Sequence, residues 1–115
     1  MPAQPTPRTL TLDIERKENR VIVRCHGQLV SGLTDILHSN VRPIIPTTKR
    51  IVLDLSDLTY MDSMGLGTLV GLYTSARTAG CELQLLQIGQ RVRELLGLTH
   101  LLDVFTIIGE HGVRL

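Results

Sequence analysis

The sequence predicts an α/β protein with a mixed β-sheet and helices packed mainly on one face, in the order β-β-α-β-α-β-α-β. Strand-like and helix-like segments alternate after residue 29, which is typical of α/β layer folds. Arg50–Ser56 is almost wholly apolar, as expected of a strand that is covered on both faces. Because crossovers between parallel strands are right-handed, successive helices are expected on one face of the sheet.

The amino-terminal part predicts a lead-in followed by a β-hairpin. Residues 1–8 hold three of the five prolines and are expected to be disordered. Leu10–Glu15 alternates apolar and polar residues, Glu18-Asn19 is a turn signal, and Arg20–Leu29 opens with a second alternating run. We expect residues 9–115 to form a single domain, because no internal repeat or long linker divides them.

A short helix is expected next, before the apolar strand. It follows Ser31-Gly32, because apolar residues then recur at helical spacing in Leu33, Ile36, Leu37 and Val41. Pro43 and Pro46 end this helix, since proline interrupts the helical hydrogen bonds.

A longer helix is predicted to begin at Asp62 or Ser63, which are both favoured N-cap residues, and to run to about Ala79. Gly80 stands where helices commonly stop. A strand, a short helix and a last strand complete the chain, at Glu82–Gln87, Gln90–Leu96 and Val104–Ile108.

The two faces of the longer helix differ sharply. At about 100° per residue, the arc expected to face the core holds Leu66, Leu69, Leu72, Tyr73 and Ala76. The opposite arc carries no charge and holds Met64, Gly67, Thr68, Gly71, Thr74, Ser75 and Thr78. Glycines inside a helix each cost roughly 0.5–1 kcal/mol relative to alanine, so stability alone does not explain this arc. Either it packs against another helix of the domain or a partner docks on it; the one-sided layering favours the partner.

Ser63 lies at the amino end of that arc. It could serve only as a cap, but Asp62 can fill that role and leave the hydroxyl unused. A phosphate on Ser63 would add roughly −1.5 to −2 charges, which a helix amino end stabilises. Phosphorylation is therefore expected to preserve the fold and to hinder a partner that must desolvate the new charge.

The composition narrows the class of function. The net charge of +1 and the three aromatic residues give no electrostatic or stacking case for nucleic acid. No secretory signal and no apolar run near 18 residues is present, so we expect a cytoplasmic protein without membrane insertion. Cys25 and Cys81 lie in apolar runs without CxxC spacing and are expected to be buried free thiols.

Catalytic signatures are lacking around Ser63. The segment has no G-x-S-x-G elbow, dinucleotide fingerprint or P-loop. The histidines have no metal-ligand spacing and lie in unrelated elements, at His26, His38, His100 and His111. We therefore expect no enzyme activity, no metal and no cofactor.

Ile51–Leu69 closely resembles the signature of STAS domains, and above all that of bacterial anti-sigma factor antagonists. That signature is a hydrophobic strand with an acidic turn, then Asp-Ser-x-Gly-Leu-Gly and a helix of small residues. Gly27-Gln28-Leu29 is similar to the family's Gly-Glu-Leu, and residues 97–105 are similar to its closing Gly-Leu…Val-Phe segment. The resemblance covers roughly residues 8–110 and implies a STAS-type mixed sheet.

The resemblance also implies a mechanism. Ser63 matches the serine that is phosphorylated by a partner anti-sigma factor, an ATP-dependent serine kinase, and Asp62 matches the acidic residue beside it. The unphosphorylated form is expected to bind that kinase and release the sigma factor, and a PP2C-type phosphatase to reset the switch. The residues expected to bind the partner are Gln28, Val30, Ser31, Asp62, Met64, Gly65, Gly67, Thr68 and Gly71.

The chain departs from the family pattern in one loop. Gln28 and Val30 stand where the family often has acidic residues, beside the switch serine. A second function of the same fold stays open: a scaffold subunit of a sensory complex, or an accessory subunit of a lipid transporter, without phospho-switching. Arg77 and Lys49-Arg50 are expected to be solvated surface charges rather than partner contacts.

Overall fold

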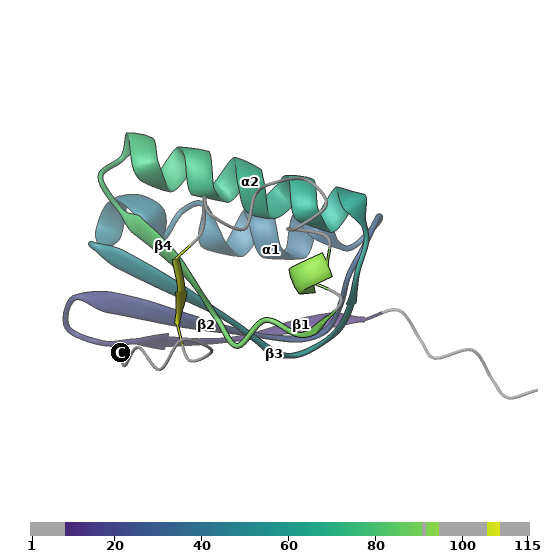
Figure 1. Cartoon of the computed structure of the whole chain (residues 1–115). Coiled ribbons are helices and arrows are strands. Elements are labelled where there is room, and N and C mark those ends of the chain that lie inside the picture. Colours follow the sequence, from purple (N-terminus) through teal and green to yellow (C-terminus); the bar gives the residue numbers. More distant parts are fainter. Residues whose placement is uncertain (1–8, 91, 95–105, 109–115) are drawn as a thin grey trace, which may run out of the picture.

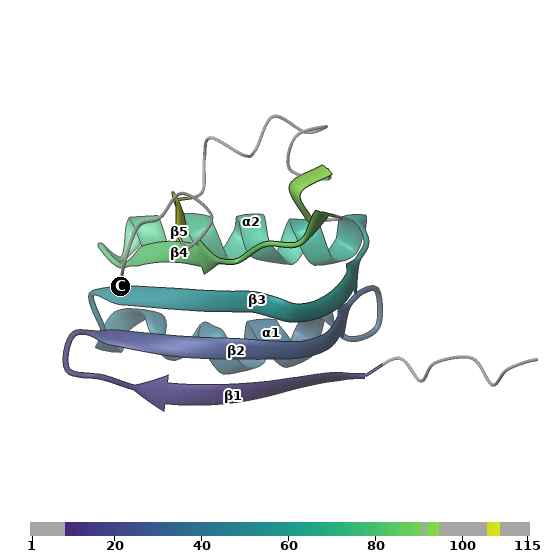
Figure 2. The ribbon, with the colours of Figure 1, turned by 60° about the horizontal axis from the view of Figure 1, so that its bottom comes forward.

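The computed structural model describes residues 9–90, 92–94 and 106–108. They contain one five-stranded sheet in the order β1-β2-β3-β4-β5 (Figures 1 and 2). The first pair is an antiparallel hairpin and the other pairs are parallel, which confirms the mixed sheet. The strands are β1 (Leu10–Arg16), β2 (Arg20–Leu29), β3 (Arg50–Met61), β4 (Glu82–Leu86) and β5 (Thr106–Ile108).

The described helices lie on one face of this sheet, as predicted (Figures 1 and 2). They are α1 (Thr34–Val41) and α2 (Ser63–Thr78), which contact each other, and a 3-10 turn follows α1 at Ile45–Thr47. The right-handed connections between parallel strands bring both helices to this side. The α/β class and the one-sided arrangement are confirmed.

The core lies between the sheet and the helices. Alternate residues of β2 and β3 point to the helices and are buried, namely Val21, Val23, Cys25, Ile51, Leu53 and Leu55. The arc of α2 that was predicted to face the core buries Leu66, Leu69, Leu72 and Ala76, and Tyr73 is half-buried against them. Apolar side chains that repeat every 2 residues in the strands and every 3.6 residues in the helix therefore form one apolar layer.

A smaller apolar cluster lies on the other face of the sheet. Ile22 and Val52 are buried there and Leu86 packs against them. Val52 alternates with Ile51 and Leu53, so β3 is apolar on both faces, as its sequence predicted. Cys25 and Cys81 are buried free thiols, also as predicted.

The predicted end of β3 at Ser56 is wrong, because the strand continues to Met61. The Asp54 carboxylate accepts the Ser56 N–H at 3.0 Å, and the register with β2 shifts between Arg24 and His26. A β-bulge at this point lets the polar residues after Ser56 stay in the strand. The end of the apolar run in the sequence is therefore not the end of the strand.

Other boundaries need smaller corrections. The strand β4 was predicted to end at Gln87 but ends at Leu86. Gln87 leaves the strand because its backbone has a φ of 51°. The helix α2 ends at Thr78, and Gly80 follows it with a φ of 76°. Residues 90 and 92–94 are helical, and the rest of the predicted Gln90–Leu96 helix lies outside the described residues, as do the lead-in and residues 104–105.

Candidate functional site

Asp62 joins the end of β2 to the amino end of α2. Its backbone N–H donates to the Leu29 carbonyl at 3.3 Å. Its carboxylate accepts two backbone N–H groups, from Ser31 at 2.9 Å and from Gly65 at 3.0 Å. Asp62 is therefore the N-cap of α2, and it also fixes the loop of residues 30–33, here called the 30–33 loop, beside that helix end.

Asp62 was predicted to contact a partner, but its carboxylate is already hydrogen-bonded within the domain and its side chain is half-buried. An N-cap aspartate satisfies N–H groups that the helix itself leaves unpaired. Its contribution to the site is to hold Ser31 and Ser63 next to each other.

Gly65 is buried, which corrects its assignment to the partner surface. A Cβ at this position would collide with the Leu29 carbonyl oxygen and lie 2.9 Å from Met61 Cγ. Only glycine lets the first turn of α2 pack this closely on the end of β2. Gly65 therefore shapes the site from below and is not part of its surface.

Ser63 is the first residue of α2 and is exposed. Its hydroxyl makes no hydrogen bond to any of the described residues, because Asp62 caps the helix. Figure 1 shows the amino end of α2 at the right, where β3 leads into the helix. A phosphate here would face the unpaired N–H groups of the first helical turn.

The outward face of α2 is here called the small-residue face and consists of Met64, Gly67, Thr68, Gly71, Thr74, Ser75 and Thr78. Met64 is 58% exposed, and Gly67 and Gly71 are also exposed. Apart from the neighbouring residues and the backbone of α2 itself, no heavy atom of the described part of the chain lies within 4 Å of where a Cβ would stand on either glycine. The alternative in which this face packs against another helix of the domain is therefore wrong for the described helices.

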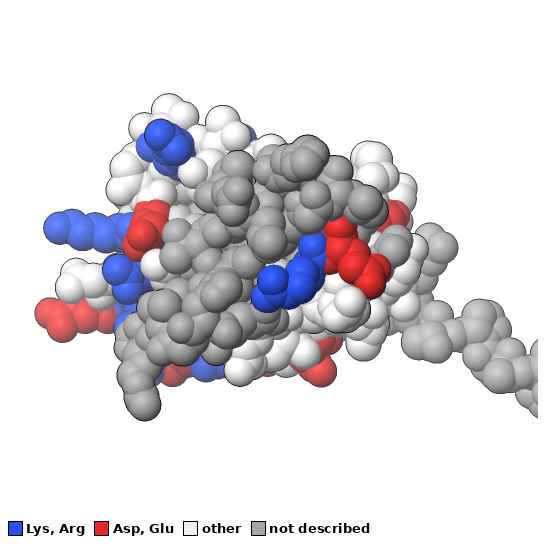
Figure 3. Space-filling view, in the orientation of Figure 1, with Lys and Arg blue, Asp and Glu red and all other residues white. Residues whose placement is uncertain are grey.

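The threonines of the small-residue face use their hydroxyl donors internally. Thr68, Thr74 and Thr78 each donate to the carbonyl four residues earlier, at 3.0–3.1 Å. These three hydroxyl donors are therefore already paired within the helix, which lowers the cost of removing water from the face. Figure 3 shows that side chains of both signs gather at the left-hand end of the molecule.

The predicted residues of the β2 end divide by burial. Ser31 is exposed and Gln28 is half-buried. Val30 is only 3% exposed, so its assignment as a partner contact is wrong. The chain turns inward at Leu29 and Val30 before the Leu33 N–H donates to the Val30 carbonyl at 2.9 Å.

A charged cluster that was not predicted from the sequence lies across β1, β2 and β3. His26 Nδ1 lies 2.6 Å from Asp57 Oδ2, and His26 Nε2 lies 2.8 Å from Asp13 Oδ2. These contacts raise the pKa of His26, with Asp57 as the larger cause and Asp13 the second. The bulge in β3 sets Asp57 opposite His26, so spacing along the sequence could not reveal the cluster.

The described residues offer no metal site: no three of their His, Cys, Asp or Glu side chains are grouped so that they could hold a metal ion. No described helix is both long enough and apolar enough to cross a membrane. Burial raises the pKa of the Cys25 thiol to about 12, so this cysteine stays protonated at neutral pH.

The sheet, the two helices on one face and the Asp-Ser segment at the start of α2 define the class. The model of the STAS domain family matches residues 11–112, and the chain belongs to that family.

Among individual proteins, the chain is similar to the anti-sigma-B factor antagonist of Bacillus subtilis (strain 168), with 28% identity over 91% of this chain and 98% of that one. Its fold is similar to an anti-sigma factor antagonist from Mycobacterium paratuberculosis, with a TM-score of 0.80, 20% identity and coverage of 92% and 91%. It is also similar to SpoIIAA of Bacillus, solved unphosphorylated (TM-score 0.73, 19% identity, 88% and 90% covered) and phosphorylated (0.69, 18%, 88% and 94%).

Proposed function

We propose that this protein is an anti-sigma factor antagonist that is switched by phosphorylation of Ser63. Unphosphorylated, it binds an anti-sigma factor serine kinase through the small-residue face and the exposed part of the 30–33 loop, and so releases the sigma factor. The phosphorylated form does not bind, and a PP2C-type phosphatase restores the active form. The cytoplasm is the compartment that this role requires.

The exposed Ser63 hydroxyl carries the proposal. It has no hydrogen-bond partner among the described residues and stands at the edge of an uncharged surface. The names of the relatives support the antagonist role, and the existence of SpoIIAA in both phosphorylation states supports the switch.

The local geometry accounts for a switch that changes binding without changing the fold. Because Asp62 supplies the cap, a modified Ser63 breaks no hydrogen bond of the described structure. Added charge at the helix amino end is stabilised by the helix dipole, typically by about 0.3–1 kcal/mol. A partner that covers the uncharged face must instead remove water from a group with nearly two charges, which is costly.

The direct test is to incubate the protein with the anti-sigma factor kinase and ATP, and to follow its mass. We expect wild-type protein and the matched control Ser39→Ala, at an exposed serine of α1, to gain one phosphate. Ser63→Ala should gain none. Phosphate on the Ser63→Ala protein would contradict the assignment, and a wild-type chain that gains none would favour the scaffold or transporter-subunit alternative.

A further inference from the structure

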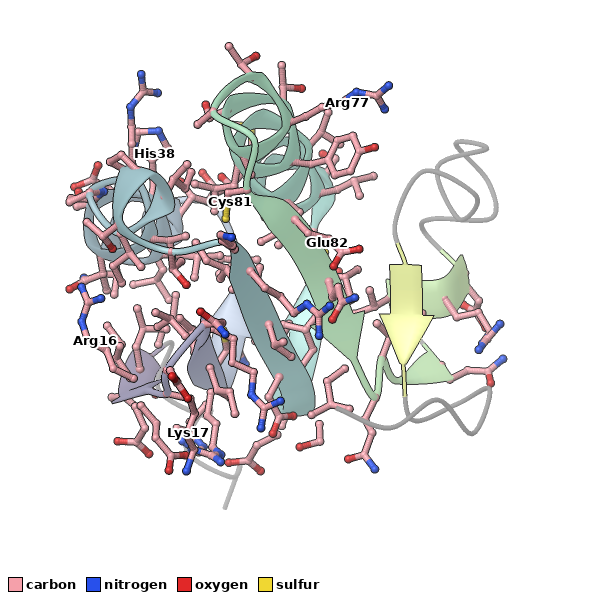
Figure 4. All side chains as sticks on the ribbon, turned by 90° about the vertical axis from the view of Figure 1, so that its left-hand side faces the viewer. Arg16, Lys17, His38, Arg77, Cys81 and Glu82 are labelled. Carbon is pink, nitrogen blue, oxygen red and sulfur yellow. The ribbon has the colours of Figure 1, made fainter. Side chains whose placement is uncertain are left out.

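A second surface feature lies at the opposite end of the sheet from Ser63. A cavity of about 510 Å³ opens where the β1–β2 turn meets the starts of β3 and β4. Figure 4 faces this end of the molecule, with Lys17 and Glu82 labelled. The charged side chains that line the cavity come from three separate stretches of sequence, and they are Lys17, Glu18, Arg20, Lys49, Arg50 and Glu82.

The parallel strands bring these side chains together. Arg20 pairs with Arg50 across β2 and β3, and Arg50 pairs with Glu82 across β3 and β4. All three residues begin their strands, so they share one edge of the sheet. The Glu82 N–H donates to the Lys49 carbonyl at 2.9 Å, which holds the β3 and β4 starts in register.

The cavity carries an excess of positive charge. Four cations and two carboxylates line it, which leaves a formal charge of +2, although the whole chain carries only +1. Arg50 Nε is paired with Glu82 Oε1 at 3.0 Å, and Lys17 Nζ with Glu15 Oε2 at 2.8 Å. Arg20 and Lys49 form no ion pair with any described carboxylate.

Arg20 also has an unsatisfied donor. Its Nε is shielded from solvent and has no hydrogen-bond acceptor among the described residues, so it gains one from a ligand only when the guanidinium group turns toward the cavity. A buried N–H of a charged group without an acceptor is costly, and such groups in folded proteins usually indicate an unseen partner. The planar guanidinium group matches the spacing of phosphate and carboxylate oxygens.

We propose that this cavity is a binding site for a phosphate group, with Arg20 and Lys49 as the residues that hold it. A phosphate dianion offsets the charges of Arg20 and Lys49, the two cations of the lining that no described carboxylate pairs. The volume exceeds that of one phosphate and falls within the range of small-molecule sites, so the phosphate belongs to a small phosphomonoester or is taken up as the free ion. The site goes beyond the Ser63 switch and is independent of it.

The test is a titration of ¹⁵N-labelled full-length protein with glycerol 3-phosphate, inorganic phosphate and chloride at constant ionic strength. We expect both phosphates to shift the amide signals of residues 17–20, 49–50 and 82 in a saturable way, and to leave residues 63–71 unshifted. Tighter binding of glycerol 3-phosphate identifies an organic phosphate as the ligand, and equal binding identifies the free ion. Shifts that chloride reproduces, or that spread evenly over the surface, would overturn the proposal.

Matched charge-removing variants locate the site. Arg20→Gln and the exposed Lys49→Gln should each weaken phosphate binding at least tenfold. Arg42→Gln removes the same charge at the carboxyl end of α1 and should leave the affinity within twofold. If Arg42→Gln weakened phosphate binding as much as the other two variants, the attraction would be general and not local to the cavity. If Lys49→Gln and a folded Arg20→Gln both bound phosphate as tightly as the wild type, the proposed site would be wrong.

Discussion

Asp62, next to Ser63, carries the structural function at this site. Asp62 accepts N–H groups from Ser31 and Gly65, whereas the Ser63 hydroxyl bonds to none of the described residues. Asp62 therefore maintains the local fold, whereas Ser63 has an exposed hydroxyl that the described fold does not use.

Replacing Asp62 should cost stability and replacing Ser63 should not. Asp62→Ala removes the N-cap and the anchor of the 30–33 loop, so we expect the free energy of unfolding to fall by about 1–3 kcal/mol. Ser63→Ala, and the control Asp35→Ala at an exposed position in the first turn of α1, should change it by less than about 0.5 kcal/mol. Urea denaturation measures all three, and equal losses for Asp62→Ala and Ser63→Ala would contradict this difference between the two residues.

His26 makes the stability depend on pH. Both of its ring nitrogens face a carboxylate oxygen, so both contacts are hydrogen bonds only when the imidazole is doubly protonated. The hydrogen bonds to Asp57 and, second, Asp13 raise its pKa above the ordinary value of 6.5. A raised pKa in the folded state gives stability that is fully present below the unfolded pKa and is lost as the pH rises through the folded pKa.

The corresponding prediction compares melting temperatures at two pH values. His26→Gln should lower the melting temperature more at pH 5.5 than at pH 9. His38→Gln, in α1 and without a contact of this kind among the described residues, should show no such difference. A His26→Gln effect that is equal at both pH values would mean that the two carboxylate contacts contribute nothing measurable.

At the scale of the element, the three glycines of α2 have two different reasons to be glycine. Gly65 is packed against Leu29 and Met61, so a side chain there cannot be accommodated without backbone movement. Gly67 and Gly71 face open space, with no described atom near enough to exclude a methyl group. Packing therefore explains the first glycine, and the proposed close approach of a partner would explain the other two.

Alanine substitutions separate these reasons. Gly65→Ala should lower the free energy of unfolding by about 2 kcal/mol or more, because the new methyl group overpacks the β2 end. Gly67→Ala and Gly71→Ala should each raise it by about 0.5–1 kcal/mol through helix propensity. We expect these two stabilised variants to bind the anti-sigma factor at least tenfold more weakly. Calorimetry measures this binding, and unchanged affinity in both variants would show that the small-residue face does not contact the partner.

At the scale of the whole molecule, the sheet separates two sites. The parallel strands β2, β3 and β4 start at the charged cavity, and β3 ends where Ser63 begins α2. Ser63 and the cavity therefore lie at opposite ends of the sheet, and Ser63 does not line the cavity.

A charge at Ser63 should consequently act on partner binding alone. Ser63→Asp is expected to change the melting temperature by no more than about 2 °C and to weaken binding of the anti-sigma factor at least tenfold. Phosphate binding at the Arg20 cavity should be unchanged in the same protein. A collapse of the melting temperature would show that Ser63 is part of the fold and would contradict the surface switch.

Local sequence patterns are enough to predict the class of fold, the order of the elements, the apolar layer of α2 and an N-cap at Asp62 or Ser63. These features depend on local periodicity and on residues next to one another, which a sequence displays directly. The family signature around Ser63 is also a continuous stretch and could be recognised without coordinates.

Which residues near Ser63 are exposed depends on the tertiary structure and could not be predicted from the sequence. Gly65 and Val30 are buried because the start of α2 packs on the end of β2, a contact between segments about 35 residues apart. The His26 cluster depends on a bulge that changes the strand register, and the cavity depends on the parallel pairing of β2, β3 and β4. Each feature arises from pairing between distant segments, and periodicity within a single segment carries no information about such pairing.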